Sequence, residues 1–209
     1  MHLKLRNYMS VFSLPVMEEF YTIQGEGVYS GVPAYFIRLA GCDVGCVWCD
    51  VKESWDASAY PKIAVEKLAQ NALDSGCGLS VITGGEPAMY DLSLLTQELH
   101  KFGVRVHIET SAAYPIIGDF DWVTLSPKKF KFPVDSELAK ADELKVIVFN
   151  KSDFEWAETF IGKLKANCKM LLQPEWDKRE KIMPLIIEYV KANPQWHISL
   201  QTHKYIGVP

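Results

Sequence analysis

Residues 41–50 read Gly-Cys-Asp-Val-Gly-Cys-Val-Trp-Cys-Asp and carry three cysteines in a C-x3-C-x2-C spacing. Cys42, Cys46 and Cys49 are near enough in sequence to bind one inorganic centre, and soft thiolates prefer iron–sulfur and zinc centres. Three thiolates would leave one iron of a 4Fe–4S cube without a protein ligand. A metal that takes part in catalysis needs such an open position. The stretch therefore predicts a catalytic iron–sulfur site.

This cysteine spacing resembles the cluster motif of the radical S-adenosylmethionine (SAM) superfamily, in which the open iron binds the amino and carboxylate groups of SAM. Two other interpretations are a zinc knuckle and three unrelated thiols. A zinc knuckle would require a fourth Cys or His at a matching spacing, and none lies close by in the sequence. The resemblance implies a 4Fe–4S cluster and SAM as cofactors.

Composition narrows the class of protein. A chain of 209 residues with 48% hydrophobic and 23% charged residues predicts a single globular domain over residues 1–209. The net charge of −4 argues against a broad nucleic-acid surface. Five cysteines, three of them clustered, and an N-terminus unlike a signal peptide favour the reducing cytoplasm. No apolar run approaches membrane-spanning length, and Cys77 and Cys168 are expected to be buried apolar thiols.

Apolar strands alternate with amphipathic helices along the chain, which predicts βαβ units and a parallel sheet. Predicted strands cover 34–39, 79–82, 104–108, 122–125, 144–149, 170–172 and 196–200, and predicted helices cover 61–75, 91–100, a short stretch from 136, 153–164 and 177–192. Only about a dozen residues separate the strands at 104–108 and 122–125, too few for a crossover helix. We therefore expect an α/β fold, an incomplete (β/α) barrel of radical SAM type with some crossover helices missing.

Unusual polar motifs follow the predicted strands at their C-terminal ends, which is the active-site face of a (β/α) barrel. Besides the cysteines, these motifs are Thr83-Gly-Gly-Glu-Pro87, Glu109-Thr-Ser111, Ser126-Pro-Lys128, Gln173-Pro174 and Gln201-Thr-His-Lys204. In the first, two glycines would let the backbone approach a ligand, and a carboxylate would accept from an ammonium. Alone it would be a tight turn, but at this distance after the cysteines it resembles the segment that holds the SAM amino group.

Several further residues would suit the SAM and substrate sites. The hydroxyl of Ser126 and the ammonium of Lys128 would suit the SAM carboxylate or ribose, and Gln173 would suit adenine, although each would equally fit an ordinary loop or strand end. Glu109 would bind ribose or substrate, or cap a turn. Gln24, in Gln24-Gly-Glu-Gly27, would pair with a heterocycle edge, and the guanidinium of Arg38 with a carboxylate. A polar turn and a surface ion pair are the structural alternatives for these last two.

The joint order of these motifs, from about residue 18 to the C-terminus, resembles the 7-carboxy-7-deazaguanine synthase (QueE) family. The resemblance implies a radical SAM carbon–nitrogen lyase that converts 6-carboxy-5,6,7,8-tetrahydropterin to 7-carboxy-7-deazaguanine with loss of ammonia, in queuosine and deazapurine biosynthesis. It implies a homodimer in the cytoplasm, a flavodoxin-type electron donor, and no stable binding of nucleic acid or membrane.

The resemblance also assigns residues to roles. It makes Cys42, Cys46 and Cys49 the cluster ligands. It places Thr83, Gly84, Gly85, Glu86, Ser126, Pro127, Lys128, Gln173, Pro174, Glu175 and Trp176 at SAM, and Ile23, Gln24, Gly25, Arg38, Thr83, His203 and Pro209 at the substrate. Trp48 would shield the cluster.

One position departs from the family pattern. Thr, or Ser in some members, usually follows Cys-Asp after the third cysteine, and its hydroxyl binds a Mg2+ ion that helps to hold the substrate. Here Val51 occupies that metal position. A valine side chain has no oxygen, whereas Mg2+ requires oxygen ligands in an octahedron. Asp50, a backbone carbonyl, waters or the substrate carboxylate would have to supply them. We expect weak or absent dependence on Mg2+.

Two rival functions fit part of the pattern. A glycyl-radical activase shares C-x3-C-x2-C but acts on a protein, whereas the Gln24-Gly-Glu-Gly27 and Gln201-Thr-His-Lys204 segments favour a small heterocycle. A non-enzymatic metal-binding module gives no reason for Gly-Gly-Glu-Pro to follow the cysteines. Anaerobically purified protein should be brown if it carries the cluster.

Overall fold

The computed structural model describes residues 12–209. Its strands form one sheet in the order β3-β1-β2-β4-β5-β6-β7-β8-β9. The strands are β1 (Ser13–Ile23), β2 (Pro33–Leu39), β3 (Lys62–Ala64), β4 (Leu79–Gly84), β5 (Arg105–Thr110), β6 (Trp122–Leu125), β7 (Glu143–Val148), β8 (Lys169–Pro174) and β9 (Trp196–Ile198). From β2 to β9 neighbouring strands are parallel, whereas β1 runs antiparallel to β2 and β3. Because β3 and β9 do not pair with each other, the barrel is incomplete, as the sequence predicted.

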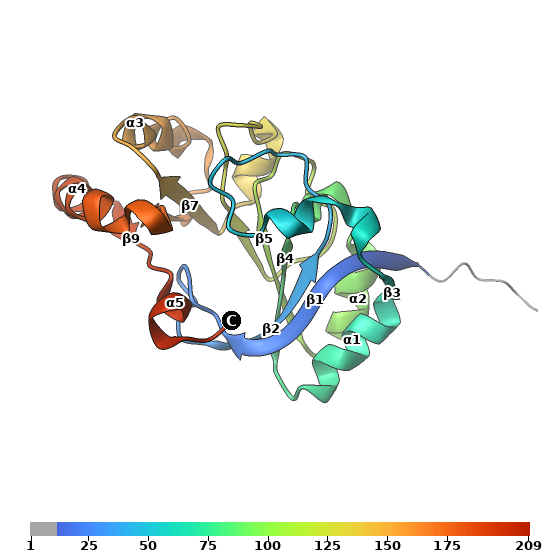
Figure 1. The fold of residues 1–209 in the computed structure, drawn as a ribbon. Coiled ribbons are helices and arrows are strands. Elements are labelled where there is room, and N and C mark those ends of the chain that lie inside the picture. The colour runs from blue at the N-terminus through green and yellow to red at the C-terminus, as the bar shows by residue number, and fades with distance from the viewer. Residues whose placement is uncertain (1–11) are drawn as a thin grey trace, which may run out of the picture.

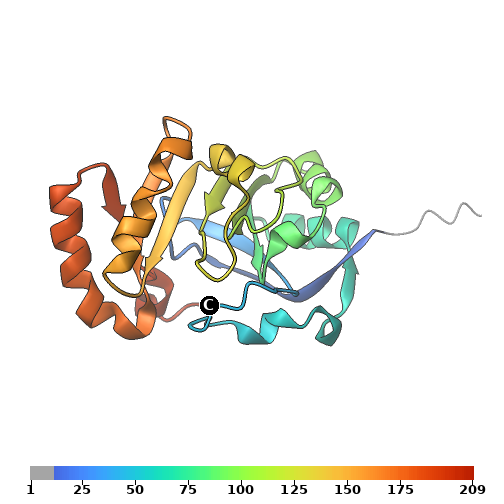
Figure 2. The same ribbon diagram turned by 90° about the horizontal axis from the view of Figure 1, so that it is seen from above.

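Five α-helices accompany the sheet in the described part of the chain. They are α1 (Val65–Asp74), α2 (Ser93–Lys101), α3 (Ser152–Glu158), α4 (Arg179–Ala192) and α5 (Thr202–Ile206). Figures 1 and 2 show α1 and α2 beside the early strands and α3 and α4 beside the late ones. No helix joins β5 to β6, and only a 3-10 helix (Asp135–Lys140) lies between β6 and β7. The predicted absence of crossover helices is confirmed. None of the helices over residues 12–209 has the length and apolar character needed to span a bilayer.

Several boundaries differ from the sequence-based expectation. The sheet gains β1, whose central Glu18 and Glu19 interrupt the apolar alternation by which strands are recognised. Residues 62–64 of the predicted 61–75 helix pair with β1 as β3. The 153–164 helix ends at Glu158, because the chain tightens there into a 3-10 turn (Ile161–Lys163). The helix α5 was not expected at all.

The core lies between the helices and the sheet. Side chains such as Leu68 of α1, Leu95 of α2, Ile82 of β4 and Ile108 of β5 are fully buried in it. This burial holds the strand ends in fixed register, since a one-residue slip would turn the apolar set toward solvent. Cys77 is buried as predicted, whereas Cys168 is only half-buried.

Candidate functional site

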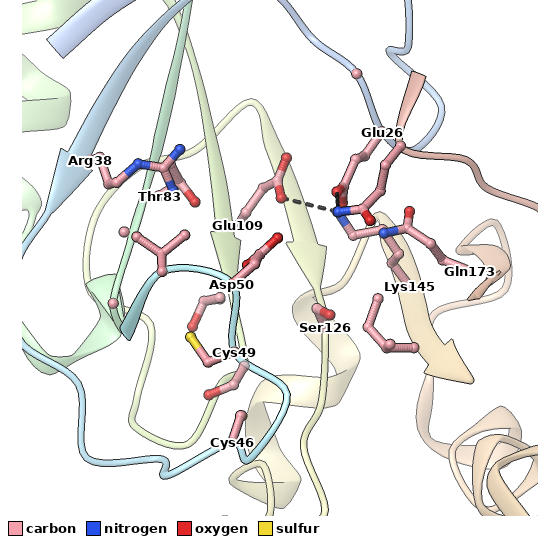
Figure 3. A pocket seen from close by; sticks show the side chains of 18 of the residues that line it. Glu26, Arg38, Cys46, Cys49, Asp50, Thr83, Glu109, Ser126, Lys145 and Gln173 are labelled. Carbon is pink, nitrogen blue, oxygen red and sulfur yellow. Dashed lines mark hydrogen bonds and ion pairs between the residues drawn. The ribbon is translucent and has the colours of Figure 1, made fainter. Parts of the chain in front are cut away.

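The predicted site residues meet at the C-terminal edge of the parallel strands, around a cavity of about 290 Å³ (Figure 3). Strand register explains part of this arrangement, because Arg38 pairs with Thr83 and Ile147 with Gln173 across neighbouring strands. All the predicted cysteine, SAM and substrate residues line the cavity except Pro127, which faces an adjoining hollow. The chain's last residue, Pro209, also lines the cavity.

The three motif cysteines lie on the loop after β2, which hydrogen bonds within the loop and to the following segment stabilise. The amide of Cys42 donates to the carbonyl of Trp55 at 3.2 Å, and the amide of Cys49 donates to the carbonyl of Cys46 at 3.2 Å. Cys46 is buried beside Val44 in a small apolar cluster against which the other two cysteines pack. Burial raises the pKa of the Cys46 thiol to about 11, partly opposed by the Lys128 ammonium.

The thiol set fits an iron–sulfur cluster better than a zinc ion. Within residues 12–209, no three His, Cys, Asp or Glu side chains are grouped so that they could hold one metal ion. A cluster spreads its irons over a cube and so accepts ligands that are farther apart. The three thiols share one cavity with an apolar wall, which is the donor chemistry and the dry surrounding that a cluster requires.

Gly84 at the end of β4 and Gly85 after it let this segment pack directly on the end of β2 and on the cysteine loop. The amide of Gly85 donates to the carbonyl of Leu39 at 2.9 Å, and the amide of Glu86 donates to the carbonyl of Gly41 at 2.8 Å. A Cβ atom on Gly84 would lie 2.1 Å from the Leu39 carbonyl oxygen, and one on Gly85 would lie 2.3 Å from that of Gly41. The two glycines are therefore needed because their backbone packs closely against other backbone atoms of the protein.

Glu86 is buried and accepts hydrogen bonds from four donors of the chain. These are the amides of Ala88 (2.9 Å) and Ser111 (2.8 Å) and the hydroxyls of Thr110 and Ser111. A carboxylate offers about four acceptor positions. Glu86 thus fixes the end of β5 to the loop after β4, and this engagement leaves little capacity for a ligand's ammonium.

Four predicted SAM residues also make hydrogen bonds within the chain. Lys128 Nζ donates to the Ser126 hydroxyl at 2.8 Å and to the Ser126 carbonyl at 2.6 Å. Burial lowers the pKa of Lys128. On the other side of the cavity, Gln173 is buried and accepts from the Ser199 hydroxyl at 2.7 Å, while Glu175 accepts from two amides of the following turn.

The substrate-side residues come from both ends of the chain. Gln24 Nε2 donates to Glu109 Oε1 at 2.7 Å. Gly25 lies against His203, because a Cβ atom there would sit 2.1 Å from His203 Nδ1. Burial lowers the pKa of His203, so its imidazole is neutral near pH 7. Arg38 stacks on Phe20 with its guanidinium carbon 5.7 Å from the ring centroid.

Sequence reasoning missed Lys145, which lies on β7 with only 3% of its side chain exposed. Its Nζ atom lies 2.5 Å from Glu26 Oε2 and 3.0 Å from Glu109 Oε2 (Figure 3). Burial opposes the charge of Glu26, but the ammonium of Lys145 outweighs it and holds the pKa of Glu26 well below its usual range. The sequence feature that could have revealed this residue is a lysine inside the apolar run 144–149. A charged residue is rarely buried unless it is paired with an opposite charge.

The residues around Val51 do not fit a protein-bound Mg2+ ion. The carboxylate of Asp50 is the nearest acidic group in sequence, and its Oδ2 atom lies 3.1 Å from Lys204 Nζ. Val51 lines the cavity without offering a side-chain oxygen. A lysine ammonium at this carboxylate opposes the binding of a second cation there, and Val51 supplies no side-chain oxygen.

Comparison with known proteins agrees with this geometry. The model of the radical SAM superfamily matches residues 36–131. A 7-carboxy-7-deazaguanine synthase of Flavobacterium psychrophilum is 53% identical over 94% of this chain and 93% of its own length, and one of a Synechocystis strain is 47% identical over 94% of each chain. The crystal structure of QueE from Escherichia coli superposes with a TM-score of 0.82 at 33% identity, covering 91% of this chain and 95% of that one.

Proposed function

The chain belongs to the 7-carboxy-7-deazaguanine synthase (QueE) family of the radical SAM superfamily, and we propose that the cavity described above is its active site. The enzyme converts 6-carboxy-5,6,7,8-tetrahydropterin to 7-carboxy-7-deazaguanine with loss of ammonia. The observation that carries this conclusion is the identity to named synthases over nearly the full chain, together with three cysteine thiols that open onto one cavity.

The cluster and SAM, when bound, supply the radical chemistry of the superfamily. We propose that Cys42, Cys46 and Cys49 hold the cluster. Residues of the loops after β4, β6 and β8 then hold SAM, with Ser126 and Gln173 as the polar contacts. Lys128 keeps a cationic group beside the cysteines, which favours the anionic thiolates. The apolar wall around Cys46 excludes water from the reacting centre.

We propose that the substrate binds between the sheet and the C-terminal segment. Glu26 and Glu109 share the single ammonium of Lys145, so this buried group carries one excess negative charge. An anionic patch suits the N–H-rich edge of a pterin. The guanidinium of Arg38 binds Glu18 through Nε at 2.6 Å and keeps its terminal nitrogens for the substrate carboxylate.

Other aspects of the assignment are also proposals. We propose that substrate binding does not depend on Mg2+, supported by Val51 and by the Asp50–Lys204 ion pair. A flavodoxin-type electron donor, a homodimeric state, a cytoplasmic location and action as a single domain rest on the family resemblance.

An anaerobic assay tests the activity directly. Reconstituted protein is incubated with SAM, dithionite and 6-carboxytetrahydropterin, and 7-carboxy-7-deazaguanine is measured by mass spectrometry. Product that disappears in Cys46→Ala supports the proposed site. Cleavage of SAM to 5′-deoxyadenosine without that product would contradict the substrate assignment while leaving the radical SAM chemistry in place.

A further inference from the structure

The loop between β1 and β2, residues 24–32, carries three residues of the substrate side but packs few apolar side chains of its own. Gln24, Gly25 and Glu26 line the cavity, whereas Val28 is 47% exposed. A loop with few buried apolar contacts takes its position from its polar contacts. The direction in which Gln24 and Glu26 point therefore depends on the groups that bind the backbone of this β1–β2 loop.

Glu143 binds this loop from inside the sheet. Glu143, Lys145 and Ile147 share one face of β7, because side chains alternate along a strand. Lys145 and Ile147 line the cavity, whereas Glu143, at the start of the strand, does not. Glu143 is only 2% exposed, and its Oε2 atom accepts from the amide of Val28 at 3.0 Å. It therefore contacts the loop from behind the cavity, outside the space that a substrate would fill.

The loop backbone lies directly against this carboxylate at Gly27. A Cβ atom on Gly27 would lie 2.2 Å from Glu143 Oε1, and the φ of +68° at this glycine is one that other residues rarely adopt. The amide of Gly27 donates to the hydroxyl of Ser199 at 3.0 Å. The two peptide groups that follow Glu26 are thus bound by two buried side chains, Ser199 and Glu143.

The burial of the Glu143 carboxylate is unfavourable in itself. Burial raises the pKa of Glu143, and the ammonium of Lys145 opposes this rise. Glu143 forms no ion pair within residues 12–209, because Lys145 Nζ pairs with Glu26 and Glu109 instead. A buried polar group that lacks an ion pair is retained through its hydrogen bonds. For Glu143 this points to its bond with the Val28 amide.

We propose that Glu143 is a positioning residue for the reaction, which holds the β1–β2 loop so that Gln24 and Glu26 meet the pterin. This inference rests on the proposed function. Glu143 lies outside the cavity, so it acts through the Val28 amide and not by touching the substrate. Ser199 binds the neighbouring amide, so the loop stays attached when Glu143 is replaced, and the expected change is a displacement of the loop.

The alternative is that Glu143 only stabilises the fold, and the chain offers a matched control for that role. Glu137 is also a buried carboxylate outside the cavity, with 4% exposure. Its Oε2 atom accepts from the amide of Ile116 at 2.9 Å and pairs with Lys140. Glu137→Leu therefore removes a comparable buried acceptor without affecting the β1–β2 loop.

Three variants test the contact between Glu143 and the loop. Glu143→Leu removes the acceptor, and Glu143→Gln keeps an oxygen that can accept from Val28. Gly27→Ala leaves Glu143 unchanged but places a methyl group against its carboxylate. For each variant and for Glu137→Leu, kcat and KM are measured with 6-carboxytetrahydropterin, and SAM affinity is measured by titration calorimetry. Hydrogen–deuterium exchange of residues 24–32 and urea unfolding are measured on the same full-length reconstituted proteins.

We expect Glu143→Leu and Gly27→Ala to raise the KM for the pterin about 10-fold while kcat and SAM affinity stay within about 2-fold of the wild type. Amide exchange in residues 24–32 should become faster, because the Val28 amide loses its acceptor. Glu143→Gln should restore most of the KM. Glu137→Leu should unfold at a lower urea concentration but keep the wild-type KM and the wild-type exchange in this loop.

A wild-type KM in Glu143→Leu overturns the proposal, as does an equal rise of KM in Glu137→Leu, which would assign the effect to lost stability. If Glu143→Leu does not fold, Gly27→Ala decides in its place, and a wild-type KM there overturns the proposal too. Absence of product in the wild type would instead contradict the proposed function. Amide exchange would still test the loop contact in that case, since wild-type exchange in Glu143→Leu would show that Glu143 does not hold the loop.

Discussion

Lys145 Nζ lies 3.0 Å from Glu109 Oε2, and the same ammonium lies 2.5 Å from Glu26 Oε2 in the wall of the cavity. Lys145→Met keeps the apolar stem but leaves both carboxylates without their cation. Removing one partner of a buried ion pair lowers the free energy of unfolding by about 3–5 kcal/mol. We therefore expect a decrease of that size in the free energy of unfolding, measured by urea denaturation, and loss of product formation.

The conservative variant Lys145→Arg separates charge from shape. It retains the positive charge, so we expect most of the stability to return. We expect a raised KM at a nearly normal kcat, because the carboxylates that face the substrate would be displaced. Wild-type stability in Lys145→Met would show that the two carboxylates do not depend on this cation.

A second prediction concerns Glu86. Glu86→Gln replaces one acceptor oxygen by an NH2 group, which would face the two donors of Ser111 at the Oε2 position or the donors of Ala88 and Thr110 at the Oε1 position. A buried donor that loses its acceptor costs about 1–3 kcal/mol. We expect the variant to unfold at lower urea concentration by that free energy and to bind SAM more weakly, because the loop after β4 is no longer fixed. Weaker SAM binding at unchanged stability would instead make Glu86 a direct ligand contact, as the sequence motif predicted.

Sequence reasoning succeeded where chemistry or periodicity marks a residue directly. The strand at 122–125 was predicted with its observed bounds, and the cysteine, glycine and SAM-side motifs lie on one edge of the sheet as expected. It failed where a tertiary partner decides the outcome. β1 is a strand because β2 and β3 pair with it on both sides, although its own pattern is broken by Glu18 and Glu19.

The charged pairs of the site were equally hidden from sequence. Glu26 and Lys145 are 119 positions apart, and only the folded chain brings them into contact. A local motif shows which groups are present but not which of them neutralise one another. For the same reason the sequence predicted Glu86 as a ligand contact, whereas its four acceptor positions are taken by the chain.

A third prediction concerns the metal position. Chelation followed by added Mg2+ should leave wild-type turnover unchanged, because Val51 supplies no oxygen and Lys204 already pairs with Asp50. Val51→Thr restores the hydroxyl, and together with Lys204→Ala it should create measurable Mn2+ binding, detected by the loss of the free-ion electron paramagnetic resonance signal. Val51→Ala is the matched control and should bind none. Activity of the wild type that disappears on chelation and returns with Mg2+ would contradict this expectation.

The last prediction concerns pH and His107, a buried residue of β5 outside the cavity. Burial, and after it the cation of Arg105, lower the pKa of His107 to about 4, against the opposing carboxylates of Asp121 and Asp142. In the unfolded chain the pKa of this histidine is near 6.5. Between about pH 4 and about pH 6.5 the unfolded chain therefore binds a proton that the folded chain does not bind. Stability is therefore complete above about pH 6.5 and decreases as the pH falls toward about 4.

His107→Gln removes this titration and retains an acceptor for the Arg105 Nη2 group, which lies 3.3 Å from His107 Nε2. Between pH 7 and pH 4.5 the free energy of unfolding should decrease in the wild type by about 1–2 kcal/mol more than in the variant, after allowance for partial screening by solvent. Urea midpoints across this range measure the difference, and His100→Gln is the control because His100 lies at the surface beside Asp121. Parallel pH curves for the wild type and His107→Gln would mean that the buried imidazole takes up its proton in the folded state as readily as in the unfolded chain.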